Sequence, residues 1–195
     1  SDVLSKLSEK CKSNHDSEFC QQVYTKVISL KDQLDPETLF NAQLFFAKKD
    51  LDRGNPKRIL DLITNNQNNK SISDAYFSMI NYYISNDDTK KESEIFKEFS
   101  DNMKTDASIL NSYAWRMTEL GLNLEDALSK SDLAINLSAD DPSLQSYIID
   151  TKAEILWLLG RTEEAISTIN LAIDIDPKSD YFVEQKNKFQ DSTEK

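Results

Sequence analysis

Glycine, proline and histidine are scarce in this chain, and each scarcity excludes a class of structure or site. Only 3 Gly and 4 Pro occur among 195 residues, too few turn-forming residues for a protein built from many short strands. The sequence therefore predicts an all-α fold of long helices joined by brief loops. His15 is the one histidine; we expect it in an exposed turn, and we expect no metal site or triad built on histidine.

Several sequence signals of membrane proteins and enzymes are also missing. The chain has no run of 18 apolar residues, so no membrane insertion is expected. It has no glycine-rich phosphate loop, no nucleophile elbow and no EF-hand spacing. We therefore expect no cofactor, no metal ion and no catalytic residue, and we predict that the chain is not an enzyme.

The charge balance restricts the partners. The chain carries 23 Lys and Arg against 34 Asp and Glu, a net charge of −11. Nucleic acid and anionic membranes are poor partners for so acidic a chain, because both are bound through surfaces rich in Lys and Arg. A neutral or basic protein or peptide fits this charge.

An internal repeat is the strongest positive signal. Three alanines recur after 39, 38 and 38 residues, as Ala114 and Ala153, Ala127 and Ala165, and Ala134 and Ala172. A period in the 30s with small residues at fixed places is typical of helical hairpins that bury their apolar faces by stacking on one another. In the best-defined copy, apolar stripes at helical spacing lie on both sides of Gly160, and Pro177 ends the hairpin.

These residues resemble the tetratricopeptide repeat (TPR) family, with Ala153, Gly160, Ala165, Ala172 and Pro177 matching its signature. The resemblance implies a right-handed α-solenoid of antiparallel hairpins in which the first helix of each hairpin lines a concave face. The stretch from Asn111 to Ile166 is also similar to the helical tail of certain bacterial thioredoxin-like proteins.

The same pattern, followed upstream, predicts one repeat domain over residues 1–195. Asp35-Pro36 and Asn55-Pro56 are helix starts, and the polar stretch 64–70 is a loop between repeats. The expected hairpins cover about 1–34, 35–66, 71–101, 106–138 and 142–176, and a capping helix covers 180–190.

Counting from the small residue at each helix crossing gives a candidate groove on the first helices. We expect it to contain Leu44, Lys48, Tyr76, Tyr83, Asn111, Trp115, Tyr147, Asp150, Glu154 and Trp157. Five of these are aromatic, and aromatic side chains concentrate binding energy at interfaces; the alternative is that some of them fill the gaps between helices. Asp150 and Glu154 beside Lys48 and Asn111 argue against a clamp for a carboxylate and favour an extended or cationic peptide with apolar anchors.

Cys11 and Cys20 are the only cysteines. Two helices joined by a turn could bring them within disulfide distance, and two separate buried thiols are the alternative. There is no C-x-x-C motif to indicate a redox-active pair. A disulfide would indicate an oxidising compartment, and we favour an extracytoplasmic setting, periplasmic or secreted, in a bacterium.

The leading functional prediction is a scaffold module that binds a peptide or protein segment in a concave groove. Two alternatives stay open. The chain could be the helical accessory region of a thioredoxin-like redox protein whose catalytic domain lies upstream, or a self-assembly module that pairs through its last helix. The sequence leaves the oligomeric state undecided.

Overall fold

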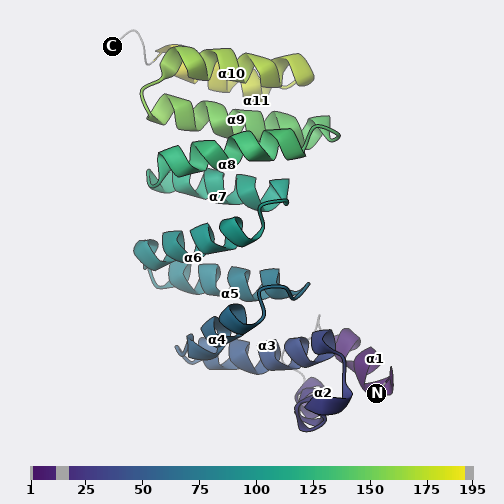
Figure 1. Cartoon of the computed structure of the whole chain (residues 1–195). Coiled ribbons are helices and arrows are strands. Elements are labelled where there is room, and N and C mark those ends of the chain that lie inside the picture. The colour runs from purple at the N-terminus through teal and green to yellow at the C-terminus, as the bar shows by residue number, and fades with distance from the viewer. Residues whose placement is uncertain (1, 12–17, 192–195) are drawn as a thin grey trace. The chain divides into compact units, whose positions relative to one another are not determined.

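The computed structural model describes residues 2–11 and 18–191, and all regular structure in these two ranges is helical (Figure 1). The predicted all-α fold is confirmed. The contacts group the chain into two compact units, one up to Ile95 and one from Phe96 onward. The boundary between the two units falls inside the helix Thr89–Asn102.

In the N-terminal unit, the first five α-helices pack in chain order, each on the next. Its elements are α1 (Asp2–Cys11), α2 (Glu18–Ser29), a 3-10 turn (Lys31–Gln33), α3 (Pro36–Asp52), α4 (Lys57–Asn65), α5 (Ile72–Ser85) and the first half of α6 (Thr89–Asn102). Helix α3 also contacts α1 and α5, so the first helices of successive hairpins are neighbours.

A disulfide joins α1 to α2. Cys11 and Cys20 are both buried, and their Cα atoms lie 5.5 Å apart. Tyr24 packs beside them, with its ring 4.9 Å from that of Phe45 on α3, and its hydroxyl donates a hydrogen bond to the carbonyl of Ser8 at 3.1 Å. The segment between the two helices, with His15, which was expected in an exposed turn, lies outside the described residues. The disulfide ties α1 to α2, and the aromatic contact packs this hairpin against α3.

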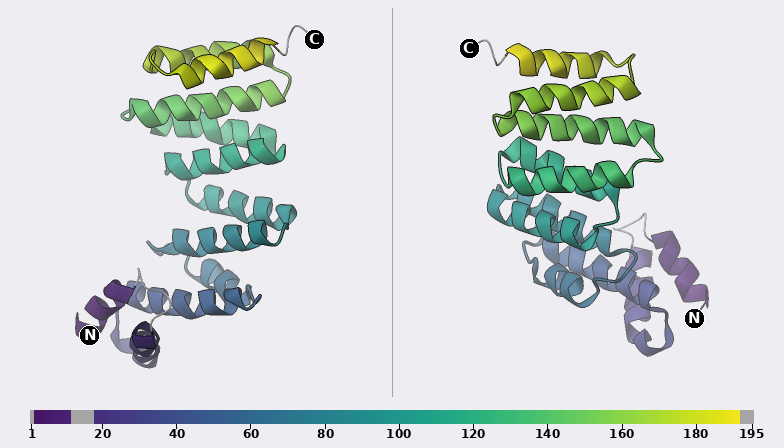
Figure 2. Two further views of the ribbon diagram at one scale, coloured as in Figure 1. Left: turned by 180° about the vertical axis from the view of Figure 1, so that it is seen from behind. Right: turned by 45° about the horizontal axis from the view of Figure 1, so that its top comes forward.

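The C-terminal unit begins with the second half of α6 and has the clearer repeat. It continues with α7 (Ala107–Leu120), α8 (Leu124–Leu137), α9 (Pro142–Leu158), α10 (Thr162–Ile175) and α11 (Asp180–Asp191). Helices α9, α10 and α11 lie side by side in both views of Figure 2. All six repeated alanines are fully buried, which lets the helices of this unit approach closely. The predicted TPR-like stacking of antiparallel hairpins is confirmed.

The chain turns between paired helices through left-handed backbone. Gly121 ends α7 with φ of 64°, and Gly160 follows α9 with φ of 76°. A glycine adopts this conformation without the steric cost of a side chain. The two turns join α7 to α8 and α9 to α10.

Three first helices begin with the same cap. The side chains of Asp35, Asp106 and Asp141 accept hydrogen bonds from the backbone N–H three residues later, at 2.8, 3.1 and 3.0 Å. Each bond satisfies one of the N–H groups that a helix start leaves without an intrahelical partner. The caps therefore fix where α3, α7 and α9 begin. Among the described residues, no helix is long and apolar enough to cross a membrane.

Candidate protein-interaction surfaces

The predicted groove residues divide between the two units, and those of the N-terminal unit are mostly core. Leu44, Tyr76 and Tyr83 are only 5%, 0% and 7% exposed. Helix α3 packs against α1, α2, α4 and α5, and α5 packs against α3 and α4, so these large side chains fill the space between helices. Lys48 is half-buried and is the one predicted residue of this unit that reaches a groove.

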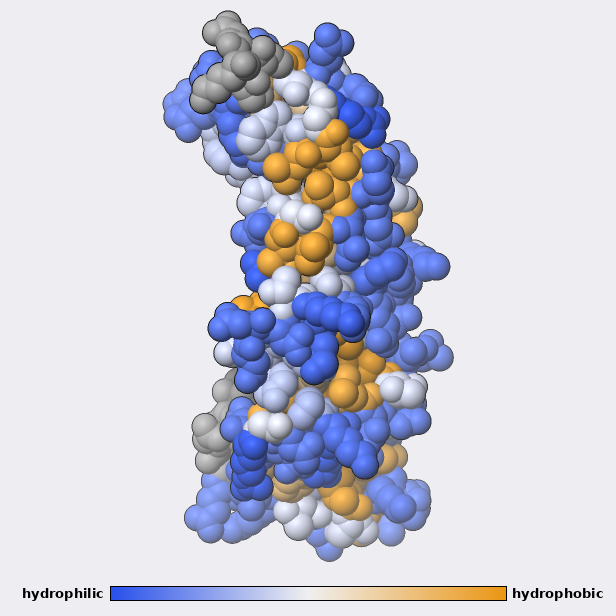
Figure 3. All heavy atoms as spheres, turned by 90° about the vertical axis from the view of Figure 1, so that its left-hand side faces the viewer, coloured by the Kyte–Doolittle hydropathy of each residue, from blue (hydrophilic) through white to orange (hydrophobic). Residues whose placement is uncertain are grey.

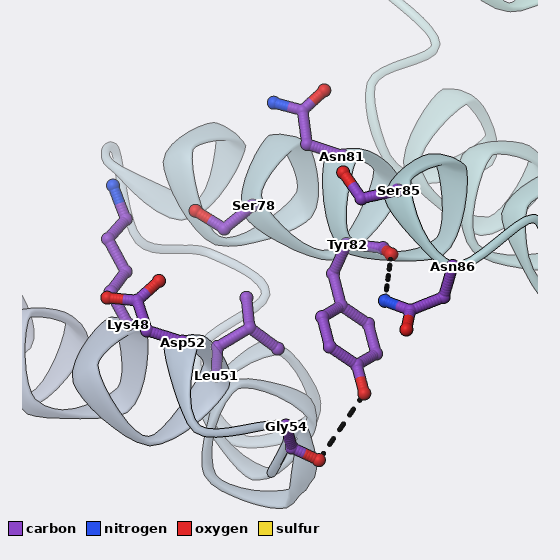
Figure 4. Close-up of a pocket in the computed structure, with 9 residues that line it drawn as sticks. All are labelled: Lys48, Leu51, Asp52, Gly54, Ser78, Asn81, Tyr82, Ser85 and Asn86. Carbon is purple, nitrogen blue, oxygen red and sulfur yellow. Dashed lines mark hydrogen bonds between the residues drawn. The ribbon is translucent and has the colours of Figure 1, made fainter.

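That groove lies between the end of α3 and the face of α5 and has a volume of about 590 Å³ (Figure 4). Lys48 and Asp52 line it from α3, while Ser78, Asn81 and Ser85 line it from α5. The last three are spaced by three and four residues, so they share one face of the helix. The Tyr82 hydroxyl donates to the carbonyl of Gly54 at 3.3 Å and closes one end.

The groove offers hydrogen-bonding groups that the described residues leave available. The side chains of Lys48, Asp52, Asn81 and Ser85 form no hydrogen bond with any residue that the structure describes. Sequence reasoning missed all but Lys48, because it sought aromatic anchors on α5. The polar spacing of 78, 81 and 85 opposite the buried positions 76, 79, 80 and 83 is the signal that could have found this face.

In the C-terminal unit, two predicted aromatic residues reach the surface. Trp115 on α7 is 37% exposed and Tyr147 on α9 is 57% exposed. Leu122 in the α7–α8 turn and Leu158 at the end of α9 are exposed as well. Figure 3 shows apolar side chains gathered over this unit on the face turned to the viewer. This unit therefore presents more apolar surface than an ordinary polar helix face would.

The other predicted groove residues of α9 lie under α11. Asp150 is 3% exposed and accepts a hydrogen bond from the Tyr181 hydroxyl at 3.0 Å. Glu154 is 7% exposed, and its Oε1 lies 2.5 Å from the Lys188 ammonium. Tyr147 packs edge-on against Phe182, and Trp157 packs against Phe189, with ring centroids 5.6 and 5.7 Å apart. The last helix thus occupies the surface where a partner was expected.

Burial dominates the electrostatics of this contact. It raises the pKa of Asp150 to about 6, and the nearby Glu154 carboxylate adds to the effect, while the hydrogen bond from Tyr181 and the charge of Lys188 oppose it. Burial also raises the pKa of the Tyr181 hydroxyl, with a further contribution from Asp150. The carboxyl group of Asp150 is therefore poised to change charge near neutral pH.

The net charge is unevenly shared between the units. The N-terminal unit has 13 Lys and Arg against 15 Asp and Glu, a net charge of −2. The C-terminal unit has 10 against 19, a net charge of −9. Within residues 2–11 and 18–191, no three His, Cys, Asp or Glu side chains cluster as metal ligands do.

Comparison with known proteins adds a structural likeness. No family model matches the chain, and no curated protein matches it. The crystal structure of a thermophilic TPR protein from Thermus thermophilus is similar over 98% of each chain, at 16% sequence identity and a TM-score of 0.44. A likeness of this degree carries no argument about function.

Proposed function

We propose that this chain is a binding module that holds a segment of another protein against the first helices of its hairpins. The observation that carries the proposal is the groove between α3 and α5, where the side chains of Lys48, Asp52, Asn81 and Ser85 have no hydrogen-bond partner among the described residues. Stacked helical hairpins bury their own backbone groups, so side chains are what such a surface offers to a ligand.

The groove chemistry suits a polypeptide in an extended conformation. An extended segment exposes backbone N–H and C=O groups that Asn81 and Ser85 can pair with, since an amide and a hydroxyl both donate and accept. Lys48 and Asp52 carry opposite charges at the same groove, and the N-terminal unit is close to neutral. These features favour a neutral segment, or one that carries both charges, in this groove.

The Cys11–Cys20 disulfide supports an oxidising, extracytoplasmic compartment for this binding, because disulfides persist there and are reduced in the cytosol. The partner would then be a secreted, periplasmic or surface protein.

Selection from a displayed library of random peptides on the full chain tests the binding function. The selected peptides are synthesised, and their affinities are measured by calorimetry for the natural chain, for Ser78→Trp, which fills the groove, and for Lys48→Ala/Asn81→Ala. We expect both variants to bind at least about tenfold more weakly. Lys57→Ala, exposed on α4 outside the groove, is the matched control and should bind normally. Peptides that bind all four proteins equally well would refute the assignment of the groove.

A further inference from the structure

Helix α11 is seated on α9 by two parallel rows of side chains. Tyr181 and Lys188 are seven residues apart and contact Asp150 and Glu154. Phe182 and Phe189 are also seven residues apart and contact Tyr147 and Trp157. Residues at this spacing lie on one face of a helix, two turns apart. Helix α11 therefore presents a polar row and an aromatic row, and the surface of α9 beneath it is acidic and aromatic.

The polar row is an incomplete match to the surface beneath it. The Oδ1 atom of Asp150 and the Oε2 atom of Glu154 are buried and accept no hydrogen bond from the described residues. The Oδ1 atom of Asn111, which is the position of α7 equivalent to Asp150, is also buried and accepts no hydrogen bond from the described residues. A phenol hydroxyl brings one donor to Asp150, whereas a guanidinium brings five in a planar fork. A helix with more cationic side chains would therefore satisfy this surface better than α11 does.

The Lys188 ammonium shows how a cation is held here. It lies 2.5 Å from Glu154 and 4.5 Å from the centre of the Trp157 ring. An ammonium over an aromatic face and against a carboxylate is stabilised by both. The net charge of −9 on the unit attracts a cationic partner and accelerates its approach.

We propose that the α9 surface is the docking site of a cationic amphipathic helix from a partner protein, and that α11 is a built-in occupant that this helix displaces. The partner helix carries aromatic residues seven positions apart, each preceded by Lys or Arg. This inference rests on the proposed function, binding by the first helices, and adds the partner chemistry and its regulation in the C-terminal unit. A second copy of this chain, which would offer its own α11, is the competing occupant.

The probe is a labelled peptide with the sequence of residues 180–191 in which Tyr181→Arg and Glu184→Lys add positive charge. Its binding to the full chain is followed by fluorescence anisotropy. In the chain variant Tyr181→Phe/Lys188→Met, α11 keeps its aromatic row and loses its polar contacts. We expect this variant to bind the peptide at least about tenfold more tightly than the natural chain, because α11 competes less well.

Two further changes test the surface itself. Adding Asp150→Asn/Glu154→Gln to the weakened chain should reduce affinity at least about tenfold, and a peptide with Phe182→Ala/Phe189→Ala should not bind. Phe189→Ala in the chain loosens α11 through packing instead and should also strengthen peptide binding. Far-UV circular dichroism of every variant establishes that the helices are intact.

The inference is overturned if the peptide binds the natural and weakened chains equally. It is also overturned if Asp150→Asn/Glu154→Gln leaves the affinity unchanged, or if the peptide fails to bind any folded variant. Dimers in light scattering that appear on weakening α11 and resist the peptide would identify a second copy as the occupant and also overturn it. Ser78→Trp should leave this affinity unchanged. A failure of this docking inference can therefore be told apart from a failure of the proposed groove between α3 and α5.

Discussion

Asp150 is a buried, ionisable residue that contacts the last helix. Its carboxyl group has a pKa of about 6 in the folded chain against an ordinary value of 3.8, mainly because burial disfavours the charged form. Between these values the folded chain binds more protons at this position than the unfolded chain. The stability contributed by Asp150 is therefore fully present below about pH 3.8 and is lost as the pH rises through about 6.

Asp150→Asn should remove this pH dependence. We expect the free energy of unfolding of the variant, relative to the natural chain, to increase by about 1–3 kcal/mol as the pH rises from about 4 to about 7.5. Urea unfolding at several pH values measures this difference. Asp174→Asn on the exposed face of α10 is the matched control, since it removes the same charge where water surrounds it. A difference for Asp150→Asn that is flat with pH would contradict the prediction.

At the residue scale, the sequence predicts helical faces better than it predicts exposure. Trp115 and Tyr147 reach the surface, but Tyr76 and Tyr83 lie in the core. The helical period identifies the same side of a first helix in every hairpin. It does not tell how much of that side a neighbouring first helix covers, and in a stack that neighbour comes from a hairpin more than 30 residues away. The cover over Asp150 and Glu154 is likewise supplied by α11.

Helix starts are the best-predicted features at the element scale, and Asp35 is the clearest of them. Its carboxylate accepts hydrogen bonds from the N–H of Thr38 at 2.8 Å and from the Thr38 hydroxyl at 2.8 Å. Pro36 occupies the first helical position, where its missing N–H costs nothing. Because α3 packs against α1, α2, α4 and α5, a weakened start affects most of the N-terminal unit.

Asp35→Ala should lower the free energy of unfolding of the N-terminal unit by about 1 kcal/mol, the usual cost of losing an aspartate cap. Site-resolved hydrogen exchange in α3 measures the loss. The hydrogen bonds from Thr38 hold the pKa of Asp35 below its ordinary value, so the contribution is present above about pH 3.8 and is lost as the pH falls further. Asp61→Ala, exposed on α4 and not a cap, should change little. An equal loss in both variants would rule out the cap as the cause.

Other helix starts lack a side-chain cap of this kind. Thr162 is the first residue of α10, and Arg161 precedes it without a side-chain cap. Arg161 instead forms a two-bond ion pair with Glu164 at 2.7 Å for each bond. Helix α6 has no glycine or alanine, and the boundary between the two units falls inside it.

At the scale of the whole molecule, the charge is polarised along the chain. A net charge of −11 suggests uniform acidity, but −2 belongs to the N-terminal unit and −9 to the C-terminal unit. This asymmetry was available in the sequence. It could not be recognised without the unit boundary, because no proline, glycine or linker marks residue 95 and the helical pattern runs through it. The C-terminal unit therefore attracts cationic partners more strongly than the N-terminal unit does, which matches the neutral groove of one and the acidic surface of the other.

Salt should change the stability of the two units by different amounts. The C-terminal unit carries like charges that repel one another, and raising the salt concentration from about 20 mM to about 500 mM shortens the screening length from about 20 Å to about 4 Å. We expect the opening free energy of the slowest amides in α9 to rise by about 1 kcal/mol, while that of α3 changes by less than about half as much. Hydrogen exchange resolved by residue measures both in one sample, so α3 is the internal control. An equal response of the two helices would mean that salt acts on the chain generally and that the acidity of the C-terminal unit does not limit its stability.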